Sequence, residues 1–331
     1  MEASKTPKFN WNEVVWYNVI ILAVWHLMAV YSLLFVMPYA PLHHIALLWV
    51  GLWFISGLGI TAGAHRLWSH RSYKATLPLR FFLMICNSMA FQGSIFEWSR
   101  DHRVHHKGSD TTADPHNSRR GFFFAHMGWV MVRKHQDVLT EGKKMSFDDL
   151  LDDPVVYYQK KFYLLSTLLC CYVLPTALGH AVGSAWNGFW IGAIFRHVWV
   201  LHMTWCVNSV AHFFGYRPYD RNIRPVESLL VSIGAIGEGW HNFHHKFPSD
   251  YATGEFGIAT GQWNPTKAFI DLCATLGLAY DLKKSRTAAS SRERVKIMVE
   301  QEKLKGILQP PSTFDQIMGW LFFGRTEDQM F

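Results

Sequence analysis

Four long runs of apolar residues dominate the hydrophobic pattern of this chain. Each run has the roughly 20 residues that a helix needs to cross about 30 Å of hydrocarbon. The pattern therefore predicts an all-α integral membrane protein with four transmembrane helices, which short connections pair into two hairpins. The predicted spans cover about residues 14–37, 45–64, 162–182 and 188–211.

The distribution of Lys and Arg sets the expected orientation. The connections inside the two hairpins contain neither residue, whereas the stretch 65–161 and the part after residue 212 are rich in both. Because positively charged loops remain on the cytosolic side of a membrane, we expect both termini and the central stretch in the cytosol. The chain then divides into a cytosolic N-terminus (1–13), a membrane domain (14–283) and a cytosolic tail (284–331).

A fifth apolar stretch, residues 77–96, is also long enough to span a membrane. Arg80, Asn87 and Gln92 interrupt it, which favours a helix that lies in the membrane interface. If the stretch spanned, the histidine-rich segments before and after it would face opposite sides of the membrane. We therefore predict an interfacial helix over 77–96.

The tail beyond the membrane domain has two parts. Residues 284–312 are polar and charged, which predicts a mobile segment. Apolar residues return after it and predict a short helix over 313–324 that also lies on the membrane surface.

The composition indicates a membrane protein that keeps a sizeable polar part. Of the 331 residues, 50% are hydrophobic and 17% are charged, against roughly 25% charged residues in soluble domains. The mean hydropathy is only +0.03. These values exclude a disordered chain, a fibre and a coiled coil. Five cysteines, three of them in apolar runs, suggest no secreted disulfide framework. The unusual feature is the 18 histidines.

Eight of these histidines form three clusters. The second and third clusters have i, i+3, i+4 spacing, which places their imidazoles on one face of a helix. The i, i+5 pair of the first cluster suits a helix end where the winding changes. Interfacial hydrogen bonding explains one cluster about as well, but it does not explain three clusters that are spaced for convergence. The clusters are His65 and His70; His102, His105 and His106; and His241, His244 and His245.

The clusters predict a metal centre. Imidazole binds iron, copper, zinc and nickel, and eight nitrogen donors exceed what one tetrahedral zinc takes, so two metals are the natural number. No cysteine and no carboxylate lies in ligand spacing with the clusters, which disfavours iron–sulfur and Glu-x-x-His di-iron sites. Asn208 and His212, four residues apart, could add ligands, although helix-end hydrogen bonding also explains this pair.

Five motifs make the chain resemble a known family, the membrane acyl-CoA desaturases of animals, and within it the stearoyl-CoA desaturase group. The resemblance runs from about residue 14 to residue 284. It implies a helical cytosolic cap with a di-iron site, in which nine histidines hold two Fe²⁺ ions and Asn208 contributes through a water. The motifs are GAHRLWSH (63–70), EWSRDHRVHHK (97–107), ADPHNSRRGFFFAHMGWVMVRKH (113–135), NSVAHFFGYRPYD (208–220) and GEGWHNFHHKFP (237–248). The implied histidine ligands are His65, His70, His102, His105, His106, His212, His241, His244 and His245.

The resemblance also implies the reaction. An acyl-CoA, O2 and two electrons give a cis-unsaturated acyl-CoA and water, with delta-9 as the default position. Removing hydrogens from an unactivated methylene needs a redox metal, because no side chain supplies such an oxidant. In the family, electrons come from NADH through cytochrome b5 reductase and cytochrome b5 at the endoplasmic reticulum membrane. The sequence has no evident nucleotide-binding glycine fingerprint, and its basic surface suits an acidic electron donor. We expect the lipid bilayer as a further partner, and no nucleic acid.

Family contacts to the acyl-CoA head group map onto six residues of this chain. Arg and Lys suit the phosphates of coenzyme A, although a solvated basic face is the alternative for each charge. The chain departs from the family at Gly93, where the family commonly has Asn, so one amide contact is expected to be missing. The six residues are Asn18, Arg100, Asp101, Arg133, Lys134 and Trp205.

Trp53 and Gly57 correspond to the family's tunnel end, which the second span shapes. We hypothesise that Trp53 limits the length of the acyl chain, while Gly57 leaves room beside it. Packing against lipid or inside the core is the alternative for both residues.

Two other functions compete with this interpretation. The first is another histidine-cluster membrane enzyme, such as a fatty-acid hydroxylase or a desaturase with different regioselectivity; the ADPHNSRRGFFF segment argues against it. The second is a non-enzymatic membrane metal-binding protein, which would predict the loss of a ligand. None of the nine histidine positions is lost.

Overall fold

The computed structural model describes residues 11–304, and nearly all regular structure in this part of the chain is helical. Three of its helices are long and apolar enough to cross a membrane: Trp16–Tyr39, Leu42–Ser69 and Tyr163–Ala181. A bent pair, Leu77–Ala90 with Ile95–Gly108, makes a fourth if the two helices count as one span. The predicted all-α class is confirmed, with three to four candidate spans.

Each long helix consists of several consecutive segments. The first joins α1 (Trp16–Tyr31), a π-helical stretch (Ser32–Val36) and a 3-10 turn (Met37–Tyr39). The second joins α2 (Leu42–His44) and α3 (Leu52–Leu58) with π-helical stretches over Ile45–Gly51 and Gly59–Ser69. The third joins α10 (Tyr163–Thr167), a π-helical stretch (Leu168–Val173) and α11 (Leu174–Ala181).

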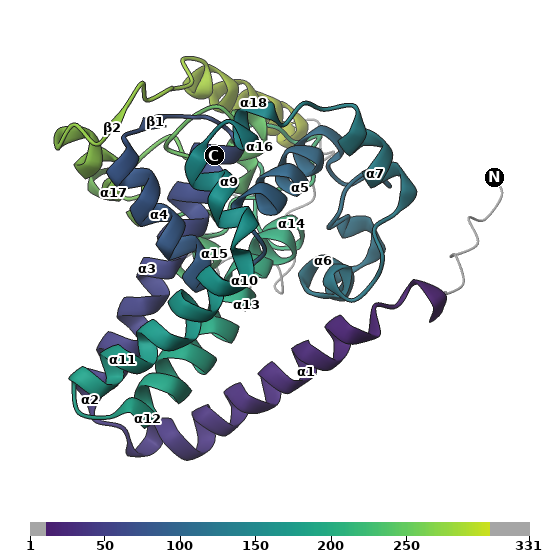
Figure 1. The fold of residues 1–331 in the computed structure, drawn as a ribbon. Coiled ribbons are helices and arrows are strands. Elements are labelled where there is room, and N and C mark those ends of the chain that lie inside the picture. Colours follow the sequence, from purple (N-terminus) through teal and green to yellow (C-terminus); the bar gives the residue numbers. More distant parts are fainter. Residues whose placement is uncertain (1–10, 305–331) are drawn as a thin grey trace.

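Apolar side chains point outward along these helices. Leu27 is 70% exposed, Leu34 55% and Leu164 77%. Contact with water would make such exposure unfavourable, whereas lipid tails accept it. Figure 1 shows α1, α3, α11 and α13 (Arg196–Asn208) extending from one end of the molecule, while most of the shorter helices gather at the other end.

The run predicted as a fourth span at 188–211 forms one continuous helix over residues 185–208. It contains α12 (Ala185–Asn187), a π-helical stretch (Gly188–Phe195) and α13. This helix is not among those that are apolar enough to span, because Arg196, His197 and His202 lower its hydropathy.

Arg196 shows how this helix accommodates its charge. The side chain is fully buried, and its guanidinium donates to the carbonyl oxygens of Gly192 at 2.9 Å, Met89 at 2.7 Å and Cys171 at 3.2 Å. Backbone carbonyls from three helices therefore surround the cation, so protein rather than lipid encloses it.

The helix predicted over 77–96 is shorter than expected. The helix α4 (Leu77–Ala90) ends before a turn in which Phe91 and Gly93 have positive φ of 52° and 92°, and α5 (Ile95–Gly108) leaves at an angle of 83°. Ser94 starts α5 with a capping box: its hydroxyl accepts from the Glu97 N–H, and the Glu97 carboxylate accepts from the Ser94 N–H. The residues with positive φ end α4, and the capping box at Ser94 begins α5.

The shorter helices form a cap around α5. Besides α5, the cap contains α6 (Phe122–His126), α7 (Gln136–Lys143), α8 (Asp148–Leu151), α9 (Pro154–Lys161), α14 (Val210–Phe213), α15 (Leu229–Gly234), α16 (His241–Lys246) and α17 (Pro265–Thr275). Two short antiparallel strands, β1 (Lys74–Ala75) and β2 (Ala279–Tyr280), join the end of the second long helix to the segment after α17. The largest apolar core lies here and includes Trp68, Leu83 and Ile270.

Part of the expected mobile tail is helical. Residues 288–304 form α18 (Ala288–Leu304), so the prediction of a mobile segment over 284–312 is wrong for this part. Ala288, Val295 and Val299 are buried at helical spacing, and Arg292 pairs with Glu255 at 3.0 Å. These contacts offset the high polarity from which mobility was predicted. The predicted helix at 313–324 lies outside the described residues, as do residues 1–10.

Candidate metal centre

The π-helical end of the second long helix carries the first two histidines. A π-helix joins residues five apart through its backbone, and the His70 N–H donates to the His65 carbonyl at 3.1 Å. Residues with i, i+5 spacing therefore share a face, and the two ring centroids lie 4.9 Å apart. This winding explains why the first cluster differs in spacing from the other two.

The helices α5 and α16 each present three histidines at i, i+3 and i+4, as their spacing predicts. The histidines before and after the 77–96 stretch meet, so this stretch does not separate them to opposite sides of a membrane. His212 joins them from α14. The α5 set is His102, His105 and His106, and the α16 set is His241, His244 and His245.

The nine histidines converge into two groups. Within each group, the possible ligand atoms all lie within 4.8 Å of one another. The five-histidine group contains His65, His70, His102, His106 and His244. The four-histidine group contains His105, His212, His241 and His245.

The Nε2 atoms face one another in both groups. In the five-histidine group, Nε2 of His244 lies 2.9 Å from Nε2 of both His65 and His106. In the four-histidine group, Nε2 of His241 lies 3.2 Å from Nε2 of His212 and 3.1 Å from Nε2 of His245. Each group thus directs several ring nitrogens at a common centre.

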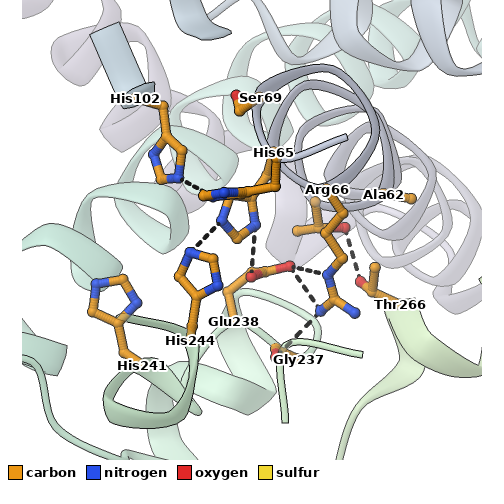
Figure 2. A network of polar contacts seen from close by, with 12 residues as sticks. Ala62, His65, Arg66, Ser69, His102, Gly237, Glu238, His241, His244 and Thr266 are labelled. Carbon is orange, nitrogen blue, oxygen red and sulfur yellow. Dashed lines mark hydrogen bonds and ion pairs between the residues drawn. The ribbon is translucent and has the colours of Figure 1, made fainter. Parts of the chain in front are cut away.

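Buried carboxylates contact the opposite ring nitrogen in some of these histidines. Glu238 Oε2 lies 2.9 Å from Nδ1 of His65, and Figure 2 shows Glu238 between His65 and Arg66. Asp114 Oδ1 lies 2.8 Å from Nδ1 of His105. A carboxylate at Nδ1 keeps the proton on that nitrogen, which leaves the Nε2 lone pair directed into the centre.

Protonation also matches a metal centre. Burial, followed by neighbouring histidines, lowers the pKa of His241, His244 and His245 well below its usual range. These three rings are therefore neutral, which is the form that binds metal. His105 is an exception: burial alone would lower its pKa, but the charge of Asp114 and its hydrogen bond outweigh burial and raise it. The same pairing holds the pKa of Asp114 below its usual range.

These residues fit two metal ions. Lone pairs on neutral imidazoles repel one another when they face across about 3 Å, and a cation between them removes the repulsion. An all-nitrogen donor set suits iron, copper, zinc or nickel. The carboxylates behind His65 and His105 are the outer partners that metal-bound imidazoles typically have.

An apolar cavity reaches this centre. His65, His102, His105 and His241 line it, together with Asn208 at the end of α13. Its other walls are largely apolar and include Ile60, Val200, Met203 and Ile236. A long hydrocarbon chain is the kind of ligand that such a cavity accepts.

The two residues predicted at the tunnel end line the same cavity. The Trp53 indole N–H donates to the Gly234 carbonyl at 3.2 Å, which fixes the ring. A Cβ atom added to Gly57 would lie 3.0 Å from Cδ1 of Ile236, so only glycine fits without a shift of that side chain. Packing against lipid alone therefore does not describe Trp53 and Gly57, because both residues line the cavity.

A second cavity adjoins the first and shares Trp98, His102, Thr204 and Asn208 with it. Of the six predicted head-group residues, Arg133 does not line this cavity and is exposed. The other five, Asn18, Arg100, Asp101, Lys134 and Trp205, do line it.

Polar contacts hold the walls of the second cavity in place. Asp101 accepts from Arg100 at 2.9 Å and forms an ion pair with Lys134. The Asn18 amide donates to the Val130 carbonyl at 2.7 Å. Gly93 also lines this cavity, and its φ of 92° is a backbone conformation that glycine adopts without strain.

Comparison with known proteins decides the family. Residues 40–253, which include all nine histidines, match the family model for fatty acid desaturases. The chain belongs to the fatty acid desaturase family. The desaturase is 54% identical to stearoyl-CoA desaturase 5 of Bos taurus over 276 residues, which cover 82% of this chain and 81% of the relative. It is 50% identical to the delta(9)-fatty-acid desaturase fat-6 of Caenorhabditis elegans, with 82% and 79% covered. It is 49% identical to an acyl-CoA delta-9 desaturase of Acheta domesticus, with 85% and 78% covered.

The sequence reasoning missed the carboxylates at the desaturase centre. Asp110 and Asp114 follow the second histidine cluster by a few residues, and Glu238 stands three residues before His241. A search for carboxylates in ligand spacing passes over them, because they contact Nδ1 atoms instead of facing the centre. Their only sequence signal is nearness to a histidine cluster.

Three histidines of the desaturase without an assigned role form a hydrogen-bonded chain. Nε2 of His26 lies 2.9 Å from Nε2 of His202, and Nδ1 of His202 lies 3.0 Å from Nε2 of His126. Nδ1 of His126 then lies 2.8 Å from the Ser209 hydroxyl. The chain links α1, α13 and α6. His116, another histidine outside the two groups, packs against Trp129 with ring centroids 4.5 Å apart.

Proposed function

We propose that this chain is an acyl-CoA desaturase that introduces a cis double bond, at delta-9 as the default position, into a long-chain saturated fatty acyl-CoA. The observation that carries the proposal is the convergence of nine histidines beside an apolar cavity. The names of relatives at 49–54% identity support the acyl-CoA substrate and the delta-9 position.

The metal site is part of the proposal. The five-histidine and four-histidine groups hold one Fe²⁺ each, Asn208 contributes through a water, and O2 is the co-substrate. When bound, the irons supply the redox chemistry with which O2 removes hydrogens from an unactivated methylene. The all-nitrogen donor set and the buried, neutral imidazoles of His241 and His244 support this assignment.

The chain's own residues bind and orient the substrate. The phosphates of coenzyme A pair with Arg100 and Lys134 at the second cavity, where Asp101 holds both side chains in place. The acyl chain extends from this cavity, past the residues that line both cavities, into the apolar cavity beside the histidines. The apolar side chains there exclude water. Trp53 limits how far the chain extends.

The proposed setting is the endoplasmic reticulum membrane. The protein crosses it four times, with the helix over 185–208 as the fourth span, and both termini and the histidine-rich cap lie in the cytosol. The basic stretch 65–161 supports this orientation through the positive-inside rule. Electrons come from cytochrome b5 and its NADH-dependent reductase, and the positive net charge suits such an acidic partner.

Expression in a desaturase-deficient yeast tests the proposal. Gas chromatography of the fatty acids, with derivatisation of double bonds, is expected to show delta-9 unsaturated products. His241→Ala is expected to abolish them, whereas His180→Ala, at an exposed histidine outside both groups, leaves them unchanged. A well-expressed wild-type protein that gives no unsaturated product, or that holds fewer than two irons after full loading, would contradict the proposal.

A further inference from the structure

The four-histidine group has two buried carboxylates behind it. Asp114 Oδ1 lies 2.8 Å from Nδ1 of His105, with side chains only 1% and 2% exposed. Asp110 Oδ1 lies 3.4 Å from Nδ1 of His212, with side chains 7% and 2% exposed. Two of the four imidazoles in this group are thus backed by a negative charge.

The loop after α5 holds these carboxylates in position. The Asp110 N–H donates to Asp114 Oδ2 at 2.8 Å, the His116 N–H donates to Asp114 Oδ1 at 2.9 Å, and the Ser118 hydroxyl donates to Asp110. One arginine comes near: Nε of Arg224 lies 3.9 Å from Asp110 Oδ1, on a side chain that is 37% exposed. An exposed cation at this distance balances the two charges only in part.

The carboxylate beside the five-histidine group differs from the other two, because it also pairs with a buried arginine. Glu238 contacts Nδ1 of His65, but its Oε1 also accepts from Nη2 of Arg66 at 2.8 Å and from Nε at 3.0 Å. Arg66 is 1% exposed, and its Nη1 donates to the carbonyls of Tyr251 and Ala252. Figure 2 shows this pair beside His65. A buried cation therefore balances the carboxylate at this group.

We infer that the two metal positions are electrostatically unequal, and that Asp110 and Asp114 are positioning residues for the four-histidine position alone. The inference rests on the two-metal centre of the proposed function. A carboxylate at Nδ1 raises the basicity of the opposite nitrogen, and replacing such a partner typically lowers metal affinity about 10–100-fold. The four-histidine position carries two largely unbalanced charges, and the five-histidine position carries a neutral Glu238–Arg66 pair. Each position therefore depends on its own carboxylates, so either can be emptied separately.

Metal stoichiometry tests this inference without measuring activity. Purified full-length protein is loaded anaerobically with Fe²⁺ and dialysed against a series of chelator-buffered Fe²⁺ concentrations, and bound iron is measured by mass spectrometry. At a concentration at which the wild type retains two equivalents, Asp114→Asn is expected to retain one, with the other released about 10–100-fold more easily. Asp110→Asn repeats the test if the Asp114 variant does not fold. Asp149→Asn, whose carboxylate contacts Arg71 and Arg103, serves as the matched control and is expected to retain both.

Co²⁺ identifies the position that is emptied. With Co²⁺ in place of iron, Asp114→Asn and Glu238→Gln are each expected to keep a different part of the wild-type visible absorption, because four and five nitrogen donors give different ligand fields. Loss of both ions, loss of neither, or the same residual spectrum in both variants would overturn the inference. A wild type that never binds two ions would instead contradict the proposed function itself.

Discussion

Replacing Trp53 with alanine is expected to let the enzyme accept longer acyl chains. Trp53 lines the apolar cavity, and its ring is held by the hydrogen bond to the Gly234 carbonyl and by edge contact with Trp199, at a centroid distance of 6.4 Å. It stands twelve residues before His65 on the same helix, which is at most roughly 18 Å at the α-helical rise of 1.5 Å per residue, since the π-helical part rises less. The indole therefore occupies space far from the metal centre, where the methyl end of a substrate would reach.

The magnitude follows from buried methylenes. Each methylene that enters the vacated space gains about 0.8 kcal/mol of apolar burial. A substrate two carbons longer gains about 1.6 kcal/mol, which corresponds to about a 15-fold rise in its kcat/KM relative to the shorter substrate. The truncation also costs about 3–5 kcal/mol of folding stability, as large aromatic truncations in cores do. This loss is common to all substrates, so it cancels in the ratio.

Competition between acyl-CoA substrates of 16, 18 and 20 carbons measures this ratio directly. Purified Trp53→Ala receives all three together, and gas chromatography quantifies the unsaturated products. Trp49→Ala is the matched control, because Trp49 stands one turn earlier on the same helix and also contacts Trp199, but does not line the cavity. An unchanged preference in Trp53→Ala, or an equal shift in Trp49→Ala, would refute the reasoning.

Three further changes test other parts of the structure. Gly93→Asn is expected to lower the thermal unfolding temperature slightly, because a φ of 92° is strained for any residue with a Cβ atom, although Asn is among those that adopt positive φ most readily. The variant is also expected to lower the KM for acyl-CoA by adding an amide at the second cavity, and an unchanged or raised KM in steady-state kinetics would contradict this. Arg196→Lys is expected to lower the thermal unfolding temperature in detergent, because one ammonium cannot reach all three carbonyls. Each buried carbonyl that loses its partner costs about 1–3 kcal/mol. An unfolding temperature equal to that of the wild type would show that the carbonyl contacts matter little. Burial raises the pKa of Glu227 to about 8, so between the usual carboxyl pKa and 8 the folded chain keeps a proton that the unfolded chain releases. Stability should therefore fall as pH rises through this window, by up to about 1.4 kcal/mol per pH unit, and Glu227→Gln, measured by thermal unfolding at several pH values, should remove this slope.

Local sequence patterns were sufficient where the structure depends on neighbouring residues. The i, i+3, i+4 spacing of the second and third histidine clusters requires only a helix, and α5 and α16 provide it. The i, i+5 spacing of His65 and His70 indicated altered winding, which the π-helical end of the second long helix confirms. Apolar runs likewise indicated the long helices, because the length and hydropathy of a helix are properties of one segment.

Sequence patterns did not predict the features that depend on packing between distant segments. The tail was expected to be mobile because it is polar, yet Val295 and Val299 are buried, and Arg292 pairs with Glu255, which is 37 residues away. The apolar stretch 77–96 read as one helix, because the capping of Ser94 by Glu97 is a weak signal inside a hydrophobic run. Composition averages over such contacts and cannot locate them.

The charge balance at the metal centre is the clearest case of this limit. Glu238 is a near neighbour of His241 in sequence, but it contacts His65, and it pairs with Arg66 across 172 positions. Histidine ligands can be carried over from a family residue by residue, since each is recognised by its own motif. Whether a carboxylate behind a ligand is neutralised depends on which cation packs against it, and no motif encodes that. The inferred inequality of the two proposed metal positions therefore follows from the packing of the segment before α16 and of the loop after α5 around the second long helix, and not from any one histidine motif.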